Sequence, residues 1–492
     1  MKTHKSEIIS SGLFALSSIL LTISMPPFLN IPFLGFAALV PAISALRMYR
    51  SRKNFLLILL FFGLIYTSVS YSWYTDIFSS IWGYVLIAAV ALWHSSLIRN
   101  GVKFEAVLPE KFQVFALPLI YSLLEFAQRS IPFIKEWWFI PYPKSQWGFP
   151  ESLQLLSITG ITGLTFIMIL SNSTIAKIIQ NIIEKKKNSK LLFVNLLIVA
   201  GVLSSGYYTV NKQNDTAASR TFRIGLVSDM ANSITEESRE GYYIQDKKLS
   251  QRILKENLLL SKDILPSADF IVWPENEFLD FNDNDMLEEL KTTAHQSSTY
   301  MVVDSYKQDK EKLYDTAVLI APDKTIAGFA EKTHLFSSEI SAGFFPSPRQ
   351  SRAIQTEKVK AGLGVCYDFH FTDVVRYLAK DGAELILMPT DDDMNQNRFF
   401  PYYHATDAVF RAVENKVAVG SANTNGASIL VNPAGKIISL SPVNEASSVT
   451  GAVNINTNKT IYTKWGDWFA YLLLIIVILA SAVKIYKRRV LS

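Results

Sequence analysis

The chain contains 492 residues, of which 49% are hydrophobic and 18% charged, and its formal net charge is +5. The apolar excess is concentrated toward the two ends of the chain, which favours membrane spans over one soluble domain. Much of the positive charge lies beside these apolar segments, so it requires no nucleic-acid partner. The chain has one cysteine, Cys366, which excludes an internal disulfide bond.

Seven apolar stretches long enough to be membrane spans precede residue 211, and an eighth closes the chain. They cover residues 10–28, 31–46, 54–73, 81–98, 112–127, 153–179, 191–210 and 469–485. The first stretch follows Lys2 and Lys5 as a signal peptide would, but it lacks a small-residue cleavage site and runs directly into the second. We therefore predict a seven-span domain over residues 1–210 and an eighth span with a tail over 461–492.

Lysine and arginine gather in alternate loops between these stretches. They lie before the first stretch and after the second, fourth, sixth and eighth, at positions that include Lys2, Arg47, Arg99, Lys185 and Lys487. The loops after the first and third stretches contain neither residue, and the loop after the fifth, with three, is the exception. Because cytoplasmic loops carry the excess of lysine and arginine, we predict that both termini are cytoplasmic and that residues 211–468 face outside.

The region from about residue 220 to 456 has a different pattern, in which short β-branched runs alternate with amphipathic segments. The runs at 221–227, 268–273, 300–304, 316–320 and 383–389 predict strands. The segments at 245–264, 285–295, 372–379 and 401–416 predict helices. This alternation indicates one α/β domain, which we place at 220–460 after a polar linker at 211–219.

Three reactive side chains in this domain follow apolar runs, where α/β folds usually build their sites. They are Glu275, Lys332 and Cys366. A thiol is mostly protonated at neutral pH, so a nucleophilic cysteine needs a nearby base or cation. Glu275 can serve as that base, and Lys332 can stabilise a thiolate and an oxyanion.

The motifs around these residues resemble those of a known family. Trp-Pro-Glu at 273–275, Glu-Lys-Thr-His-Leu at 331–335 and Gly-Val-Cys-Tyr-Asp at 364–368 are similar, in this order, to the Glu-Lys-Cys triad of the nitrilase (carbon-nitrogen hydrolase) superfamily. The segments 411–416, 422–427 and 432–436 are similar to its later strands. With eight spans around such a domain, the chain resembles the bacterial apolipoprotein N-acyltransferases, as do the segments 32–41, 147–166 and 460–468.

This resemblance implies a membrane-embedded helical domain joined to a nitrilase-like αββα sandwich. It implies transfer of an acyl chain from a phospholipid, through a cysteine thioester, to the α-amine of the S-diacylglyceryl cysteine of a lipoprotein. The partners would be the phospholipid donor, the lipoprotein acceptor and membrane lipid. No cofactor or metal is implied, and we expect a monomer in the bacterial inner membrane with its catalytic domain in the periplasm.

The resemblance also assigns residue roles. Glu275 would be the general base, Lys332 the oxyanion stabiliser, Cys366 the nucleophile and Glu339 a supporting acid. Substrate contacts would come from three further positions, which are Tyr367, Asp368 and Gly148.

The sequence departs from the family pattern at three places. Asp368 stands where the family usually has glutamate, Val-Ser-Asp-Met at 227–230 replaces a Val-Gln pattern, and Thr-Asp-Asp-Asp-Met at 390–394 replaces Asn-Asp-Ala-Trp-Phe. These departures concern the substrate pocket rather than the triad.

Other interpretations remain open at this stage. A lone cysteine is most often a buried hydrophobe, and a glutamate or lysine is most often a solvated surface charge. A Cys-His hydrolase using His334 or His370 is formally allowed, although the local signatures of cysteine proteases are absent. The six histidines show no metal-ligand spacing, which argues against a metal site. As alternative functions we keep a membrane-tethered amidase or hydrolase and a catalytically silent protein that binds lipids or lipoproteins. Glu125, inside the fifth stretch, is either functional or structural, in which case it snorkels to the membrane interface or is hydrogen-bonded to a neighbouring span.

Overall fold

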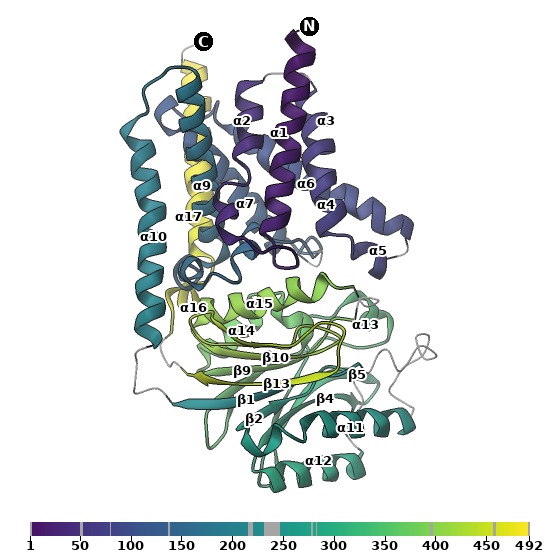
Figure 1. Ribbon diagram of the computed structural model, residues 1–492. Coiled ribbons are helices and arrows are strands. Elements are labelled where there is room, and N and C mark those ends of the chain that lie inside the picture. The colour runs from purple at the N-terminus through teal and green to yellow at the C-terminus, as the bar shows by residue number, and fades with distance from the viewer. Residues whose placement is uncertain are drawn as a thin grey trace. The chain divides into compact units, whose positions relative to one another are not determined.

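The chain folds into two compact units, shown in Figure 1. The computed structural model describes residues 2–49, 53–78, 80–135, 138–214, 220–230, 247–276, 279–281, 283–393, 397–455 and 459–490. One unit, here called the helical unit, comprises Met1–Asn211 together with Trp465–Ser492. The other, here called the sandwich unit, comprises Lys212–Lys464.

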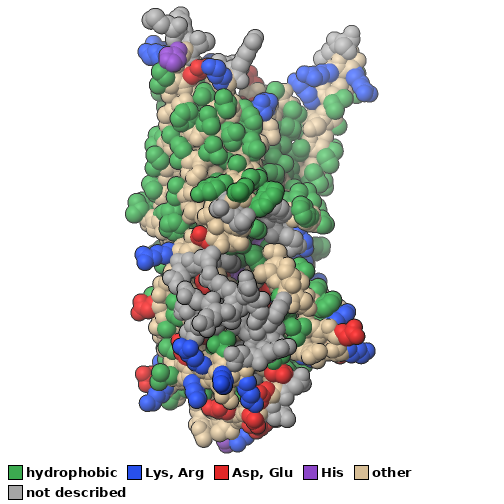
Figure 2. Space-filling view, turned by 90° about the vertical axis from the view of Figure 1, so that its right-hand side faces the viewer, with side chains coloured by type: hydrophobic (Ala, Val, Ile, Leu, Met, Phe, Trp, Pro, Cys, Tyr) green, Lys and Arg blue, Asp and Glu red, His purple; other side chains and the backbone are tan. Residues whose placement is uncertain are grey.

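The helical unit is built from α-helices joined by short turns. Its elements are α1 (Lys2–Ser24), η1 (Pro32–Phe36), α2 (Val40–Met48), α3 (Asn54–Ile58), η2 (Leu59–Leu64), α4 (Ile65–Ser70), α5 (Tyr74–Ile77), α6 (Ser80–Phe104), η3 (Glu110–Phe115), α7 (Ala116–Ser130), η4 (Tyr142–Gln146), α8 (Pro150–Leu153), α9 (Leu156–Ile183), α10 (Lys190–Asn214) and α17 (Trp468–Val490). Figure 2 shows hydrophobic side chains over much of its visible face, with lysine and arginine gathered at one end. That distribution fits a lipid-facing surface.

Among the described residues, five helices are long and apolar enough to cross a membrane. They are His4–Ser24, Ile81–Phe104, Leu156–Ile183, Lys190–Lys212 and Trp468–Val490. The other three predicted stretches form shorter or interrupted helices. Pro32 opens the separate turn η1 before α2, a π-helical segment (η2) lies between α3 and α4, and α7 has 15 residues. The prediction of eight single spans is therefore not reproduced helix for helix, and the number of crossings stays a prediction.

The sandwich unit contains two β-sheets. Within the described residues the first sheet has seven strands, in the order β13-β1-β2-β4-β5-β6 with β3 beside β4, and the second has six, in the order β12-β11-β10-β9-β8-β7. The first sheet consists of β1 (Thr221–Ser228), β2 (Phe270–Val272), β3 (Leu279–Asp280), β4 (Tyr300–Asp309), β5 (Lys312–Ile320), β6 (Ile326–Glu331) and β13 (Ser447–Asn454). The second consists of β7 (Ile354–Gln355), β8 (Lys360–Leu363), β9 (Leu385–Asp391), β10 (Ala418–Thr424), β11 (Ile429–Val431) and β12 (Ile437–Leu440).

Helices cover the outer face of each sheet, which gives the four layers of an αββα sandwich (Figure 1). α11 (Lys247–Ser261) and α12 (Asn284–Ser297) pack on the first sheet, and α14 (Asp373–Lys380) and α15 (Phe400–Asn415) pack on the second. The Asp283 side chain caps α12 by accepting from the backbone N–H groups of its first turn. Short helical elements complete the unit: η7 (Leu265–Ser267), α13 (Ser337–Ser341), η8 (Cys366–Phe369) and α16 (Ile461–Trp465).

Apolar cores lie between these layers. One lies between the sheets and includes Leu226, Val272, Leu363 and Leu387, all fully buried. Another lies between the first sheet and α11 and α12. Strands with apolar side chains on both faces are expected where a sheet is covered on both sides. The predicted nitrilase-like sandwich is confirmed, and each predicted strand and helix between 220 and 416 is present with shifted ends.

Candidate active site

The three predicted reactive residues each follow a strand of the sandwich unit. Glu275 comes shortly after β2, Lys332 directly after β6, and Cys366 opens η8 just beyond β8. The main chain of Glu275 is fixed from the second sheet, because its N–H donates to Thr390 O (3.2 Å) and its carbonyl accepts from Thr424 Oγ1 (3.1 Å). The site is therefore held by both sheets.

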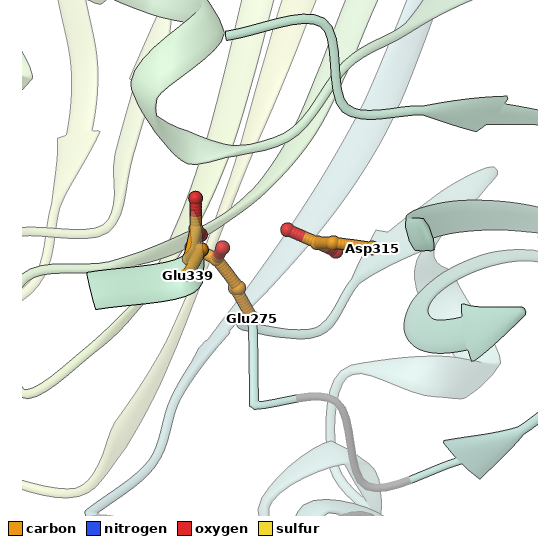
Figure 3. A group of neighbouring side chains, drawn as sticks. All are labelled: Glu275, Asp315 and Glu339. Carbon is orange, nitrogen blue, oxygen red and sulfur yellow. The ribbon is translucent and has the colours of Figure 1, made fainter. Parts of the chain in front are cut away.

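Lys332 is the centre of a buried group of carboxylates. Its Nζ lies 2.5 Å from Glu275 Oε1 and 3.2 Å from Asp315 Oδ2, and it also pairs with Glu339 Oε1. The lysine side chain is 1% exposed. Figure 3 shows the three carboxylates pointing toward one another from separate segments. A buried charge requires partners of this kind.

The electrostatics of this group favour a charged lysine. Burial opposes the ammonium of Lys332, but the three neighbouring carboxylates outweigh that effect and hold its pKa well above the usual range. Such a carboxylate cluster also has the donor set of a cation site, since one ligand atom from each lies within 4.8 Å of the others. A divalent ion placed there would compete with the lysine ammonium, which already supplies the positive charge.

Glu339 is brought to the group by α13. One of its carboxylate oxygens pairs with Lys332, and the other accepts the backbone N–H of Phe336 at 2.7 Å. Burial raises the pKa of Glu339, while the charge of Lys332 lowers it. The predicted supporting acid therefore contacts the lysine and is fixed by its own loop.

Cys366 stands at a strained turn. Its φ angle is +41°, in the left-handed region that side chains rarely adopt outside glycine and asparagine. The half-buried thiol Sγ lies 3.5 Å from the carbonyl oxygen of Asp391. Burial raises the pKa of the Cys366 thiol well above its usual range, and the charge of Glu275 raises it further, whereas Lys332 lowers it. The resting group is thus a thiol, and a nucleophilic role would require a base.

Asp368 holds the turn of Cys366 against the segment that follows Lys332. Its carboxylate accepts from the backbone N–H groups of Val365 (3.1 Å), Thr333 (3.1 Å) and His334 (2.9 Å). Burial raises the pKa of Asp368 to about 6. These contacts support a positioning role rather than the predicted contact with substrate.

Tyr367 is also buried, at 2% exposure, and packs in an aromatic group. Its ring stacks on His370 with centroids 5.5 Å apart and meets Phe336 and Phe371 edge-on. Like those of Asp368, these contacts support a role for Tyr367 in positioning the turn that contains Cys366.

Asp315 was missed by sequence reasoning, although it contacts Lys332 through both its main chain and its side chain. Its carbonyl accepts the Lys332 N–H at 2.8 Å. The available signal was a carboxylate inside the apolar strand 312–320, whose burial without a partner would be costly. Pairing between β5 and β6 is what brings it beside the lysine.

The two histidines considered as alternative bases are engaged elsewhere. His334 Nε2 lies 3.0 Å from Asp373 Oδ1, and its ring stacks on Phe371 at 3.8 Å. His370 stacks on Tyr367, and its Nδ1 lies 3.5 Å from Asp407 Oδ2. These positions give little support to a Cys-His hydrolase.

The segments that depart from the family pattern form buried polar networks. Asp229 accepts from Asn257 (2.9 Å), Asn276 (2.8 Å) and Thr424 (3.0 Å). A second network joins Asp392 to His404 (2.5 Å) and Asn423 (2.8 Å). Both acids therefore have internal partners, and Met394 lies outside the described residues.

Two predicted residues lie in the helical unit. Gly148 is exposed in the segment between η4 and α8. Glu125, on α7, accepts from the Tyr142 N–H at 2.7 Å and from Thr165 Oγ1 at 2.5 Å. These bonds agree with the interpretation of Glu125 as a residue that is hydrogen-bonded to neighbouring segments.

Comparison with known families covers both units. Residues 237–461 match the family model described as carbon-nitrogen hydrolase, and residues 17–174 match the apolipoprotein N-acyltransferase N-terminal domain. The chain belongs to the apolipoprotein N-acyltransferase family. This agrees with the resemblance read from the motifs and identifies the chain as a membrane protein.

Members of this family with similar sequences come from several bacteria. The chain is 24% identical to an apolipoprotein N-acyltransferase of Geobacter metallireducens over 73% of this chain and 71% of that one. It is 22% identical to apolipoprotein N-acyltransferase 1 of Treponema denticola over 95% of this chain and 94% of that one.

Solved structures that resemble the chain include a carbon-nitrogen hydrolase of Helicobacter pylori, at 17% identity and a TM-score of 0.39, and Nit3 of Saccharomyces cerevisiae, at 20% and 0.38. Each covers 48% of this chain, and they are covered to 89% and 90% of their own lengths.

Proposed function

We propose that this protein moves an acyl chain from a phospholipid to the α-amine of the N-terminal S-diacylglyceryl cysteine of lipoproteins. The observation that carries the proposal is the buried contact of Lys332 with Glu275 in a carbon-nitrogen hydrolase domain. The turn of the single cysteine is bonded through Asp368 to the segment that follows Lys332. Membership of the apolipoprotein N-acyltransferase family supplies the substrate class.

In the first half of the proposed reaction, the carboxylate of Glu275 takes the proton of the Cys366 thiol. The thiolate then attacks the ester carbonyl of the phospholipid, and the ammonium of Lys332 with a backbone N–H stabilises the tetrahedral oxyanion. The intermediate collapses to a thioester and expels the lysophospholipid alkoxide, which takes the proton back from Glu275. Positive charge on Lys332 favours both the thiolate and the oxyanion.

In the second half, the free α-amine of the lipoprotein attacks the thioester. Glu275 accepts the proton that the amine loses, and Cys366 leaves as a thiolate that is reprotonated by Glu275. The product is an amide. Glu339 and Asp315 keep Lys332 charged and oriented throughout, so they act as positioning residues.

The proposal includes the placement of the protein. Hydrophobic substrates on both sides of the reaction explain why a sandwich unit of this kind is joined to membrane helices. We propose that it is a monomer in the bacterial inner membrane, with the sandwich unit in the periplasm and both termini in the cytoplasm, on the basis of the distribution of lysine and arginine.

The test is formation of the acyl-enzyme. Purified protein incubated with a phospholipid labelled in its acyl chains should form an adduct that hydroxylamine releases, and Cys366→Ala should form none while unfolding at the same temperature as the wild type. Labelling that survives Cys366→Ala would remove the assigned nucleophile.

The acceptor is tested separately. Addition of a diacylglyceryl-modified peptide should discharge the thioester and yield a triacylated peptide by mass spectrometry. If the thioester forms but is discharged only by water, the protein is a membrane-tethered hydrolase. If the wild type never forms a thioester, it is a silent binding relative.

A further inference from the structure

A groove runs along α17 inside the helical unit, away from the residues described above. It has a volume of about 610 Å³, and its walls are the segment 107–115, α7, α9 and α17. Leu119, Phe166 and Leu473 lie at one part of it, whereas Lys484 and Lys487 line another. The groove is therefore apolar over most of its length and basic at one end.

The way α17 packs explains the groove. At its start α17 is held against the unit, because Ala470 and Leu473 are buried and the rings of Phe469 and Tyr471 meet Phe166 and Phe126 edge-on. Farther along, the helix is open, and Leu479 is 60% exposed. From Leu473 to Lys484 the helix rises roughly 16 Å, a length suited to an acyl chain.

The groove has ammonium groups in and beside its wall. Lys484 and Lys487 are three residues apart on α17, so their ammonium groups share a face of that helix. Phe112 also contributes to the wall, and the ammonium of Lys111 lies 4.8 Å from the centroid of its ring. Lys111 thus adds a third ammonium group beside a residue that lines the groove.

We infer that this groove binds one anionic phospholipid, with an acyl chain along α17 and its phosphate on Lys484 and Lys487. Basic pockets between membrane helices favour anionic headgroups, and a zwitterionic lipid lacks the net negative charge that these ammonium groups attract. The site is formed by the helical unit alone. It goes beyond the proposed acyl transfer, because none of its residues belongs to the group around Lys332 and Cys366.

The experiment measures lipid binding to the full-length protein by native mass spectrometry in detergent, with phosphatidylglycerol and phosphatidylcholine of identical acyl chains as probes. We expect one phosphatidylglycerol per chain, bound roughly thirtyfold more tightly than phosphatidylcholine, about sixfold for each lysine. The double variant Lys484→Gln/Lys487→Gln should lose this preference.

A matched control carries the same charge change outside the groove. Lys185→Gln/Lys187→Gln alters two exposed lysines after α9 and should keep the preference of the wild type. A second variant, Ala480→Trp, fills the apolar wall while leaving both groove lysines in place, and it should weaken binding of both lipids.

Three results would overturn the inference. These are unchanged phosphatidylglycerol binding in Lys484→Gln/Lys487→Gln, equal binding of the two lipids to the wild type, and a dimer mass without bound lipid, which would indicate that a second copy covers the groove. Because binding is read without substrate turnover, failure of this inference is distinguishable from failure of the proposed acyl transfer.

Discussion

The positive charge of Lys332 compensates the charges of three buried carboxylates. Removal of this side chain should therefore be the most damaging change to the site. Lys332→Met leaves Glu275, Asp315 and Glu339 without their shared cation, and loss of one partner from a buried ion pair costs about 3–5 kcal/mol. We expect a large fall in the unfolding temperature together with loss of the acyl-enzyme, measured by thermal unfolding in detergent and by adduct formation.

The control for that change is Lys291→Met. Lys291 pairs with the exposed Glu288 one turn away on α12, where an ion pair contributes well under about 1 kcal/mol. Its unfolding temperature should stay close to that of the wild type. Equal decreases in the unfolding temperatures of the two variants would show that the contacts of Lys332 with the carboxylates do not stabilise the fold more than an exposed ion pair does.

Asp368 should make stability depend on pH. Burial raises its folded pKa to about 6 from an ordinary value of 3.8, so the folded state binds this proton more tightly than the unfolded chain does. Stability contributed by protonation is therefore lost as the pH rises from about 4 to 6, by roughly 3 kcal/mol. Asp368→Asn does not titrate and resembles the protonated acid in shape, so its unfolding temperature should rise relative to that of the wild type as the pH rises through this window.

Asp323 provides the control of opposite sign. Hydrogen bonds from the side chain and the backbone N–H of Thr325 lower the pKa of Asp323, so any stability it contributes is lost only as the pH falls below the ordinary value. The unfolding temperature of Asp323→Asn should show no such rise relative to the wild type between pH 4 and 6. If Asp368→Asn behaves in the same way, Asp368 is ionised in the folded protein throughout that range.

At the scale of single residues, sequence reasoning selected the residues that lie in motifs. It missed Asp315, whose position becomes evident only from the pairing of strands. Glu275, Lys332, Glu339 and Cys366 stand in recognisable local patterns, and the structure brings the first three into contact. Asp315 has no motif, because its place beside Lys332 arises from the register of β5 with β6. The contact of Asp368 with substrate stays a prediction, and its bonds to backbone N–H groups could not be predicted because they depend on how two loops meet.

At the scale of elements, the sandwich unit followed its sequence pattern more closely than the helical unit did. Alternation of β-branched runs and amphipathic segments predicted β1, β4, β9, α12 and α15 to within a few residues, except that β4 continues beyond its predicted end. Hydropathy, by contrast, depends on the composition of a stretch and does not show whether its helix is continuous. It could not show the separate turn at Pro32 or the π-helical segment η2, which depend on local backbone hydrogen bonding.

Glu125 joins three elements of the helical unit, since it lies on α7 and accepts from Tyr142 at the start of η4 and from Thr165 on α9. Glu125→Ala leaves the buried Tyr142 N–H without this acceptor, at a cost of about 1–3 kcal/mol. We expect faster hydrogen exchange over residues 142–149 and a lower unfolding temperature.

Glu125→Gln keeps one acceptor oxygen and should fall between the wild type and Glu125→Ala. Glu110→Ala, at an exposed position in η3, should leave exchange in this segment unchanged. Protection of residues 142–149 that persists in Glu125→Ala would mean that the turn is held by other contacts.

At the scale of the whole molecule, the order of apolar and basic segments makes a topological prediction. Lysine and arginine resist transfer across the membrane, so loops rich in them should remain cytoplasmic. Because Cys366 is the single cysteine, Cys366→Ala gives a cysteine-free chain in which one reporter can be placed at a time. Lys255→Cys on α11 and Lys187→Cys after α9 are exposed positions on either side of the predicted boundary.

In intact cells with a permeabilised outer membrane, an impermeant maleimide should label Lys255→Cys and should reach Lys187→Cys only after lysis. Labelling of Lys187→Cys before lysis, with Lys255→Cys protected, would invert the orientation and place the sandwich unit in the cytoplasm, where the proposed reaction would not meet periplasmic lipoproteins.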